Sequence, residues 1–110
     1  MKVDHKSHTV IIKDTQGDLP SFLTKLTQQY KSFEKSNITI DLLAYKNLNV
    51  ADIETFVALS KQHIKAKKSF VIVADNIDFN EVSDAILVVP SLLEAHDIIE
   101  MEEIERDLGF

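Results

Sequence analysis

The feature that most constrains the fold of this chain is an alternation between short β-branched runs and longer amphipathic stretches. The runs occupy residues 9–13, 37–43, 70–74 and 86–89, and Val and Ile dominate them. Between the runs, apolar side chains recur at spacings of three and four, which is the period of an α-helix. Strands that alternate with helices pair in parallel through right-handed crossovers. We therefore expect an α/β fold with a single open, mostly parallel sheet of four or five strands and helices packed on it.

The first half of the chain predicts a hairpin, a helix and a further strand. Residues 2–5 form a weak strand pattern that can fold back on residues 9–13. Asp18 suits the N-cap of a helix over residues 19–36, because its carboxylate accepts hydrogen bonds from the free backbone amides there. The inner stripe of that helix comprises Leu19, Phe22, Leu23, Leu26, Tyr30 and Phe33. Residues 37–43 break strict alternation, as expected of a strand that is covered on both faces.

The second half continues the same pattern. A second helix is expected over residues 50–67, with Asn49 as its N-cap. Its inner stripe comprises Ile53, Phe56, Val57, Ser60 and Ile64. Residues 70–74 are apolar throughout, which suits a strand at the centre of a parallel sheet. One or two helical turns over residues 80–84 then lead to the last strand.

The C-terminal segment is the most distinctive part of the chain. Ser91 and Glu94 form a capping-box pattern, which predicts a last helix that runs to about residue 108. Residues 91–110 hold seven acids and a single Lys or Arg, so the net charge of −6 lies there. Apolar side chains lie among these acids, namely Met101, Ile104, Leu108 and Phe110. Two interpretations stay open: the helix packs on the sheet and shows its acids to water, or it docks into a basic, partly apolar groove of a protein partner.

Composition excludes several classes of protein. The chain has no cysteine, which rules out a disulfide scaffold and a thiolate metal site. Bases and acids cancel over residues 1–90, whereas nucleic-acid binding needs clustered bases, so we expect no nucleic-acid partner. The apolar runs are far shorter than the roughly 20 residues that cross a bilayer, and no secretory signal is evident. We expect one cytoplasmic domain over residues 1–110, without a membrane span and without a cofactor.

No catalytic or metal-binding motif stands out in the sequence. Two glycines are too few for a glycine-rich phosphate loop. Residues 75–81 are acidic but lack the glycine and the ligand spacing of a calcium loop, so a capped loop is expected. His63 and His96 fall near apolar stripes, where a structural role is favoured over a ligand role. An acid-base pair of His96 with Asp41 or Asp75 stays open, but we expect no enzymatic activity.

The element order β-β-α-β-α-β-α-β-α resembles that of the STAS domain, the fold of anti-sigma-factor antagonists and of sulfate-transporter C-terminal domains. Two stretches carry the resemblance beyond that order. The first holds the strand ITIDL (38–42) and the helix entry LNVADIETF (48–56). The second holds the strand FVIVA (70–74) and the helix start SLLEA (91–95). The resemblance covers essentially the whole chain and implies a regulatory module that acts by binding another protein.

The STAS family carries its switch in an Asp-Ser-Ser-Gly-type motif at the start of the second helix, where a partner kinase phosphorylates a serine. The matching positions here are Asp52, Ile53, Glu54 and Thr55. The aspartate matches, but Glu54 replaces a serine, so the resemblance implies a module without the phosphorylatable serine. Asp52 and Glu54 either contact a protein partner, as a permanent charge in place of phosphate, or only complement the positive end of a helix. Thr55 is an alternative phosphate acceptor.

The sequence thus predicts a set of partner-binding residues, namely Asp52, Glu54, Thr55, Met101, Ile104, Leu108 and Phe110. A small-molecule or lipid-binding STAS-like domain is the alternative, and it requires an apolar pocket between helix and sheet. Pairing of two copies along an open sheet edge is a further alternative. Short bacterial chains similar to this one sometimes carry the label ribonuclease Z. The zinc-binding His-x-His-x-Asp-His run of such nucleases is missing from this sequence, so that activity is not expected.

Overall fold

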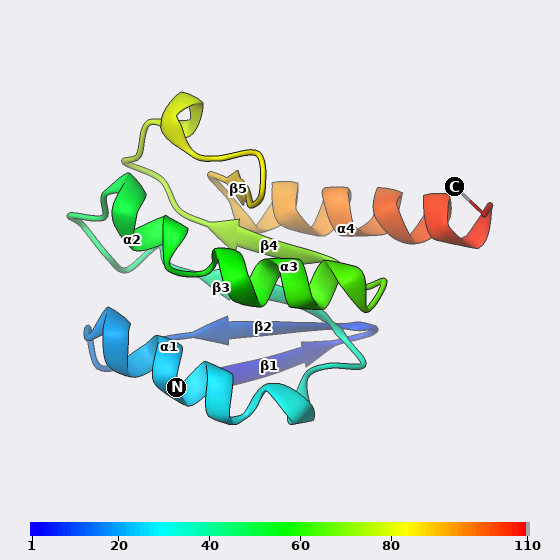
Figure 1. Cartoon of the computed structure of the whole chain (residues 1–110), viewed down its shortest axis with the longest axis horizontal. Coiled ribbons are helices and arrows are strands. Elements are labelled where there is room, and N and C mark those ends of the chain that lie inside the picture. The colour runs from blue at the N-terminus through cyan, green and yellow to red at the C-terminus, as the bar shows by residue number, and fades with distance from the viewer. Residues whose placement is uncertain (110) are drawn as a thin grey trace.

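A computed structural model describes residues 1–109 and contains one five-stranded sheet with helices on both faces (Figure 1). The strands lie side by side in chain order: β1 (Lys2–Lys6), β2 (Thr9–Lys13), β3 (Asn37–Asp41), β4 (Phe70–Val73) and β5 (Leu87–Val89). β1 and β2 form an antiparallel hairpin, whereas all other neighbours pair in parallel. The expected α/β class and the mostly parallel sheet are therefore confirmed.

The helices divide unequally between the two faces of the sheet. One face is covered by α1 (Leu19–Gln28), α2 (Val50–Glu54), α3 (Val57–Lys65) and the 3₁₀ turn η1 (Tyr30–Ser32), and the other by α4 (Leu92–Asp107) alone (Figure 1). A second 3₁₀ turn, η2 (Phe79–Glu81), precedes β5. The larger core lies under α1 to α3 and includes Ile12, Phe22, Leu26, Ile38, Ile40, Ile53, Phe56 and Ile72. The smaller core lies under α4 and comprises Val71, Val73, Val89, Ala95 and Ile99.

β3 and β4 are buried along their whole length, which explains why β4 is apolar throughout. In β3 the same burial encloses the polar side chains of Asn37, Thr39 and Asp41. α4 packs mainly against β3, β4 and β5. The hairpin half of that face is therefore left open beside α4. This unequal cover determines where the open half of the sheet and the exposed face of α4 lie.

The first helix is shorter than the sequence predicts. α1 ends at Gln28 rather than at residue 36, and the chain continues as the 3₁₀ turn η1. Within that turn, the Phe33 N–H donates to the Tyr30 carbonyl at 2.8 Å. Both aromatic side chains are buried in the larger core. The 3₁₀ turn has less favourable hydrogen bonds than an α-helix, but it allows both aromatic rings to be buried.

The second helix is interrupted where the sequence predicts a continuous one. The Phe56 N–H donates to the Ile53 carbonyl at 3.0 Å, three residues back instead of four. Ile53 and Phe56 consequently both enter the core with no exposed surface. The helix that follows is rotated, so that Leu59 and His63 face inward. Ile64, which the sequence places inside, is 51% exposed.

The predicted N-cap residues are confirmed, although for Ser91 and Glu94 the structure shows only the bond to the Ser91 side chain. Asp18, Asn49 and Ser91 each accept a hydrogen bond from a backbone N–H in the first turn of the helix that follows. Gly109 ends the described chain after α4 with a φ of +82°, which glycine adopts without steric strain. Within residues 1–109, no helix has the length and apolar character needed to cross a membrane.

Candidate functional site

The inner face of α4 changes character halfway along the helix. Its first half packs Ala95 and Ile99 on the β4 valines of the smaller core. Its second half extends past the N-terminal end of β4 (Figure 1). There the same face carries Glu102 and Arg106, which are polar but only partly exposed. The inner face of α4 thus makes apolar contacts over the sheet and carries polar residues beyond the end of β4.

Glu102 and Arg106 anchor the second half of α4 to the starts of β3 and β4. Arg106 donates from Nη1 to Ser69 Oγ at 3.1 Å and from Nη2 to Asn37 Oδ1 at 3.3 Å. The Ser69 hydroxyl donates to Glu102 Oε1 at 2.5 Å. Asn37 and Ser69 are both 1% exposed, so these charge-assisted bonds act in a largely desolvated place. We refer to these four residues as the Arg106 clamp.

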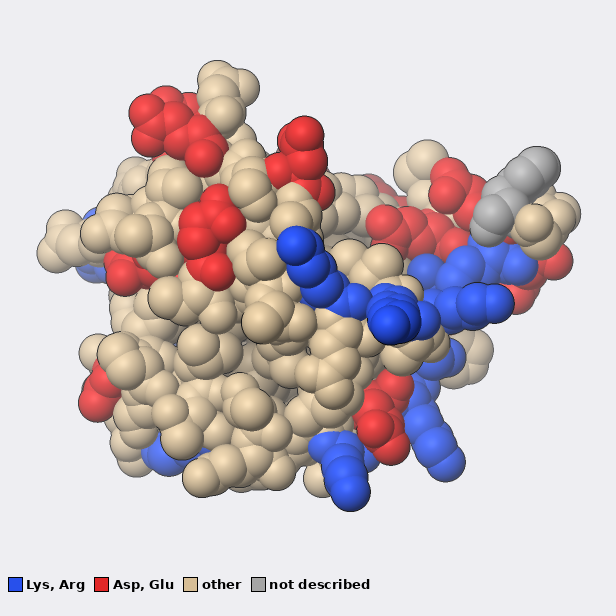
Figure 2. All heavy atoms as spheres, in the orientation of Figure 1, with Lys and Arg blue, Asp and Glu red and all other residues tan. Residues whose placement is uncertain are grey.

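The opposite face of α4 is apolar and exposed. Met101, Ile104 and Leu108, which we call the outer strip, are 61%, 58% and 67% exposed. The exposed acids that flank the outer strip are Glu100, Glu105 and Asp107. Acidic side chains gather over this end of α4, beside a group of Lys and Arg side chains (Figure 2). The helix therefore presents an apolar stripe between acidic borders to solvent.

The residues predicted at the start of the second helix are engaged within the fold. Asp52 Oδ2 accepts a hydrogen bond from the Asn49 N–H at 3.1 Å, which completes a reciprocal capping box. The Thr55 hydroxyl donates to the Asp52 carbonyl at 2.6 Å. Glu54 Oε1 accepts from the Ser83 N–H at 2.8 Å and so ties α2 to the loop before β5. These side chains have a structural role, and their contact with a partner stays a prediction.

The two groups of predicted site residues do not form one site. α2 lies at one end of the long axis of the molecule, and the C-terminal end of α4 lies at the other (Figure 1). Phe110 lies outside the described residues. A partner would therefore meet either α2 or the outer strip, unless it spanned the length of the domain.

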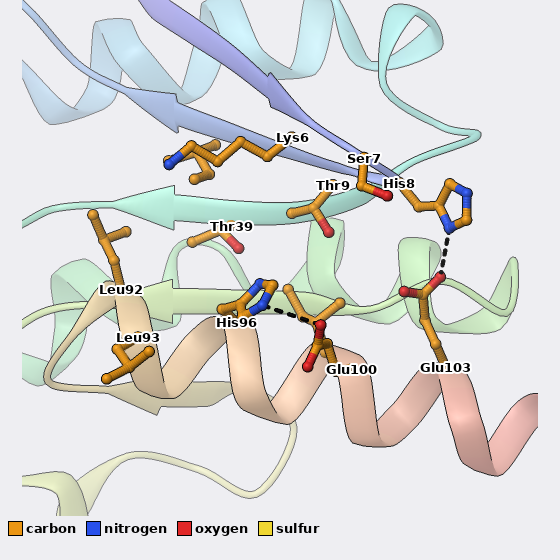
Figure 3. A pocket seen from close by; sticks show the side chains of 12 residues that line it. Lys6, Ser7, His8, Thr9, Thr39, Leu92, Leu93, His96, Glu100 and Glu103 are labelled. Carbon is orange, nitrogen blue, oxygen red and sulfur yellow. Dashed lines mark hydrogen bonds and ion pairs between the residues drawn. The ribbon is translucent and has the colours of Figure 1, made fainter.

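A groove of about 440 Å³ lies between the β1–β2 hairpin and α4 (Figure 3). Two His–Glu contacts border it: His8 Nδ1 lies 3.3 Å from Glu103 Oε2, and His96 Nε2 lies 3.1 Å from Glu100 Oε1. Sequence reasoning missed this groove because its lining comes from the hairpin, β3 and α4, which no local pattern links. It is the kind of apolar space between helix and sheet that a small-molecule ligand requires.

His63 is fully buried and has the structural role that the sequence favours. Its Nε2 donates to the Ser36 carbonyl at 2.7 Å, which leaves Nδ1 to accept from the Tyr30 hydroxyl, also at 2.7 Å. Burial lowers the pKa of His63 below its usual value of 6.5. The bond to Ser36 opposes this shift, whereas the charges of Lys68 and Arg106 add to it. Both ring nitrogens are satisfied, so neither is free to bind a ligand.

His96 forms its ion pair with Glu100 rather than with either of the aspartates considered above. Asp41 instead accepts a hydrogen bond from the Leu43 N–H at 3.0 Å. Asp78, in the acidic loop before η2, caps that turn by accepting from the Asn80 N–H at 3.0 Å. Within residues 1–109, no group of three or more His, Asp or Glu side chains is arranged to hold a metal ion.

Asp14 organises the carboxyl-terminal end of β2. Its carboxylate accepts hydrogen bonds from the N–H groups of Gln16 and Asp18, both at 3.1 Å, and from the Tyr45 hydroxyl. Burial raises the pKa of Asp14, but these hydrogen bonds outweigh it and hold the pKa below the usual 3.8. Burial and the neighbouring carboxylate raise the pKa of Tyr45. Ligands often bind at this edge of open α/β sheets, but here Tyr45 and Asp14 bind each other.

Comparison with known proteins does not assign a family. No family model matches the chain, and no curated protein matches it. The geometry of α4 and of the groove beside it therefore carries the functional inference, and the STAS resemblance stays a proposal.

Proposed function

We propose that this chain is a non-enzymatic protein-interaction module whose partner binds the outer strip of α4. The observation that carries this proposal is the exposure of Met101, Ile104 and Leu108, each more than half accessible on one helix face. Apolar side chains grouped in this way are typical of protein-binding surfaces. Full burial of one such side chain contributes about 1.5–3 kcal/mol, so a partner that covers all three gains appreciable affinity.

The Arg106 clamp supports the same function because it holds the outer strip in place. Without it, the half of α4 that extends past β4 would be free to fray. A preformed helix loses less conformational freedom on binding than a disordered segment does. The clamp faces the sheet and leaves the outer strip uncovered, so anchoring and binding use opposite faces of one helix.

The charges around the outer strip favour a basic partner. Glu100, Glu105 and Asp107 border the apolar residues and would meet complementary Lys or Arg side chains in a partly apolar groove. The same acids oppose pairing of the outer strip with a second copy of itself, because like charges would face each other. We therefore propose a different protein as the partner, not a homodimer through α4.

We also propose that the module belongs with the STAS-like domains, on the order of its elements. The STAS switch lies at the start of the second helix, where this chain has Glu54 in place of a serine. The bond from the Ser83 N–H to Glu54 supports a structural role at this position. Regulation through a partner would then act at α4, with α2 contributing stability.

Site-specific crosslinking in the source cell tests the proposed function. A photo-reactive amino acid replaces Ile104 in the full chain, and the matched control replaces Phe79, which is 41% exposed on η2. We expect one stoichiometric protein to crosslink from position 104 only, and Leu108→Lys in the chain that carries the crosslinker at 104 to abolish its capture. Equal capture from both positions, or no capture from either, would contradict the proposal. Substitution is preferable to truncation after residue 100, which would also remove half of the Arg106 clamp.

Small-molecule binding is the second candidate function. It is favoured by the groove beside the hairpin, whose volume of about 440 Å³ falls within the range of small-molecule sites. The groove and the outer strip lie on different sides of α4, so one protein can serve both functions.

A further inference from the structure

The groove beside α4 exists because the second face of the sheet is only partly covered. In β2, Val10 and Ile12 turn toward the larger core, so the alternate residues Thr9 and Ile11 face the groove. The parallel register places Thr39 of β3 directly beside Ile11. This floor is a property of the described fold itself and needs no rearrangement to form.

The floor and walls of the groove combine apolar surface with hydroxyl groups. Ile11 is half-buried, Ile99 is 2% exposed, and Leu92 forms part of the opposite wall. The hydroxyl oxygens of Thr9 and Thr39 point toward the helix side of the groove (Figure 3). Such a lining suits the apolar body of a small molecule, with a few polar atoms to orient it.

Lys6 is the one Lys or Arg side chain among the described residues that line the groove. His96 pairs with Glu100 along α4, and His8 pairs with Glu103 across the end of the groove (Figure 3). Each glutamate of the lining thus lies beside a histidine rather than beside Lys6. Within residues 1–109, Lys6 takes part in no ion pair, and its side chain lies along the strand side of the groove.

We propose that this groove binds a small apolar monocarboxylate, such as a medium-chain fatty acid. The carboxylate pairs with the Lys6 ammonium, and the hydrocarbon chain lies on Ile11 and Leu92. A single lysine matches a single negative charge. A dianionic phosphate ester would bring a second negative charge, for which the lining offers no further Lys or Arg side chain. The open shape and the single ion pair indicate a weak, reversible site.

This inference does not depend on the proposed protein partner. Glu100 borders both surfaces, but the groove otherwise uses Leu92, His96 and Glu103 of α4, whereas the partner would cover Met101, Ile104 and Leu108. A variant of the outer strip should therefore leave ligand binding unchanged. Failure of one proposal is thus distinguishable from failure of the other.

Titration of the isotope-labelled full chain with decanoate, followed by amide chemical shifts, tests the site. We expect shifts centred on Thr9, Ile11 and Thr39, with a Kd on the order of 1 mM. Decanol and decyl phosphate should each bind about fivefold more weakly, because one lacks the charge and the other carries too much. Ile104→Lys should bind decanoate as the unaltered chain does.

Two matched variants examine the ion pair. Lys6→Met keeps the length of the side chain and should weaken decanoate binding by about fivefold. Lys2→Met changes the same strand outside the groove and should leave binding unchanged.

A third variant examines the apolar floor of the groove. Ile11→Thr keeps a β-branched residue in β2 but shortens the apolar side chain, and should weaken binding by about threefold.

Three results would overturn the inference. The first is a titration that leaves the groove amides unshifted. The second is equal or tighter binding of decanol or decyl phosphate, which removes the case for a monocarboxylate. The third is an equal effect of Lys6→Met and Lys2→Met, which would mean that Lys6 has no special part in the site.

Discussion

α1, α2 and α3 cover one face of the sheet, whereas α4 alone covers part of the other. Under the first three helices, the rings of Phe22, Phe56 and Phe70 are at most 2% exposed. Under α4, the core holds only Val, Ala and Ile side chains. The first face is thus closed, while the second leaves a groove beside α4 and an apolar strip on top of it.

The difference shows how a small domain divides its surfaces between stability and binding. The buried aromatic side chains of the described residues all lie in the larger core, which α4 does not cover. Residues on and around α4 are therefore freer to serve a ligand or a partner. If this division is correct, equivalent changes on the two faces will have unequal effects.

The largest expected effect is the removal of an aromatic ring from the closed face. Phe56→Ala should lower the free energy of unfolding by about 3–5 kcal/mol, because it leaves a cavity in the larger core. Ile99→Ala under α4 should lower it by about 2–3 kcal/mol, since fewer side chains surround it. Urea denaturation of both variants measures the two values. A larger loss for Ile99→Ala would invert the comparison.

The Arg106 clamp should have an intermediate effect that is confined to α4. Arg106→Met should lower the free energy of unfolding by about 1–3 kcal/mol, because it removes charge-assisted bonds to Ser69 and Asn37. Hydrogen exchange should quicken in the second half of α4 and stay unchanged in α1. Glu105→Gln, on the exposed side, is the control. Unchanged protection of α4 would mean that the apolar first half alone holds the helix.

The free energy of unfolding should also depend on pH, because His63 is buried within the domain. This effect should be smaller than that of Arg106→Met. The pKa of His63 is lower in the folded chain than its usual 6.5, so the unfolded chain binds the additional proton. The free energy of unfolding should therefore be highest above pH 6.5 and decline as the pH falls below it. Urea denaturation between pH 7.5 and 5.5 measures this decline. It should shrink in His63→Gln and persist in His96→Gln, and equal slopes in both would contradict the assignment.

The smallest expected effect on stability belongs to the outer strip. Ile104→Lys should change the free energy of unfolding by no more than about 0.5 kcal/mol, because the side chain is 58% exposed. Thermal and urea denaturation check this value. A loss of about 2 kcal/mol would show that the strip packs within the domain, and it would remove the basis for partner binding there.

The positions of the strands along the chain and the starts of the helices could be predicted because their signals are local. The β-branched runs of β2, β3 and β4 read directly as strands. Asp18, Asn49 and Ser91 bond to amides within one turn, so their spacing alone reveals the caps. The breaks after α1 and α2 could not be predicted, because burial of Tyr30 and Phe56 in a core built by distant strands decides them.

The candidate surfaces were predictable only in part. The apolar spacing of Met101, Ile104 and Leu108 is visible in the sequence, but it left open which way the stripe faces. Glu102 and Arg106 occupy the inner position instead, because the overhanging half of α4 meets buried polar groups at the ends of β3 and β4. Lys6 gave no sequence signal as a ligand-binding residue, since its place depends on α4 lying across the sheet from the hairpin.

By itself, the sequence determined the α/β class, the succession of strands and helices along the chain and the acidic character of the last helix. Periodicity, capping and charge involve only a few neighbouring residues, so they can be recognised in a single amino-acid sequence. The tertiary structure alone decided which face of α4 is buried and which half of the sheet is left open. Both outcomes depend on contacts between segments that are far apart in the chain. Only the folded structure shows which segment covers which part of the sheet.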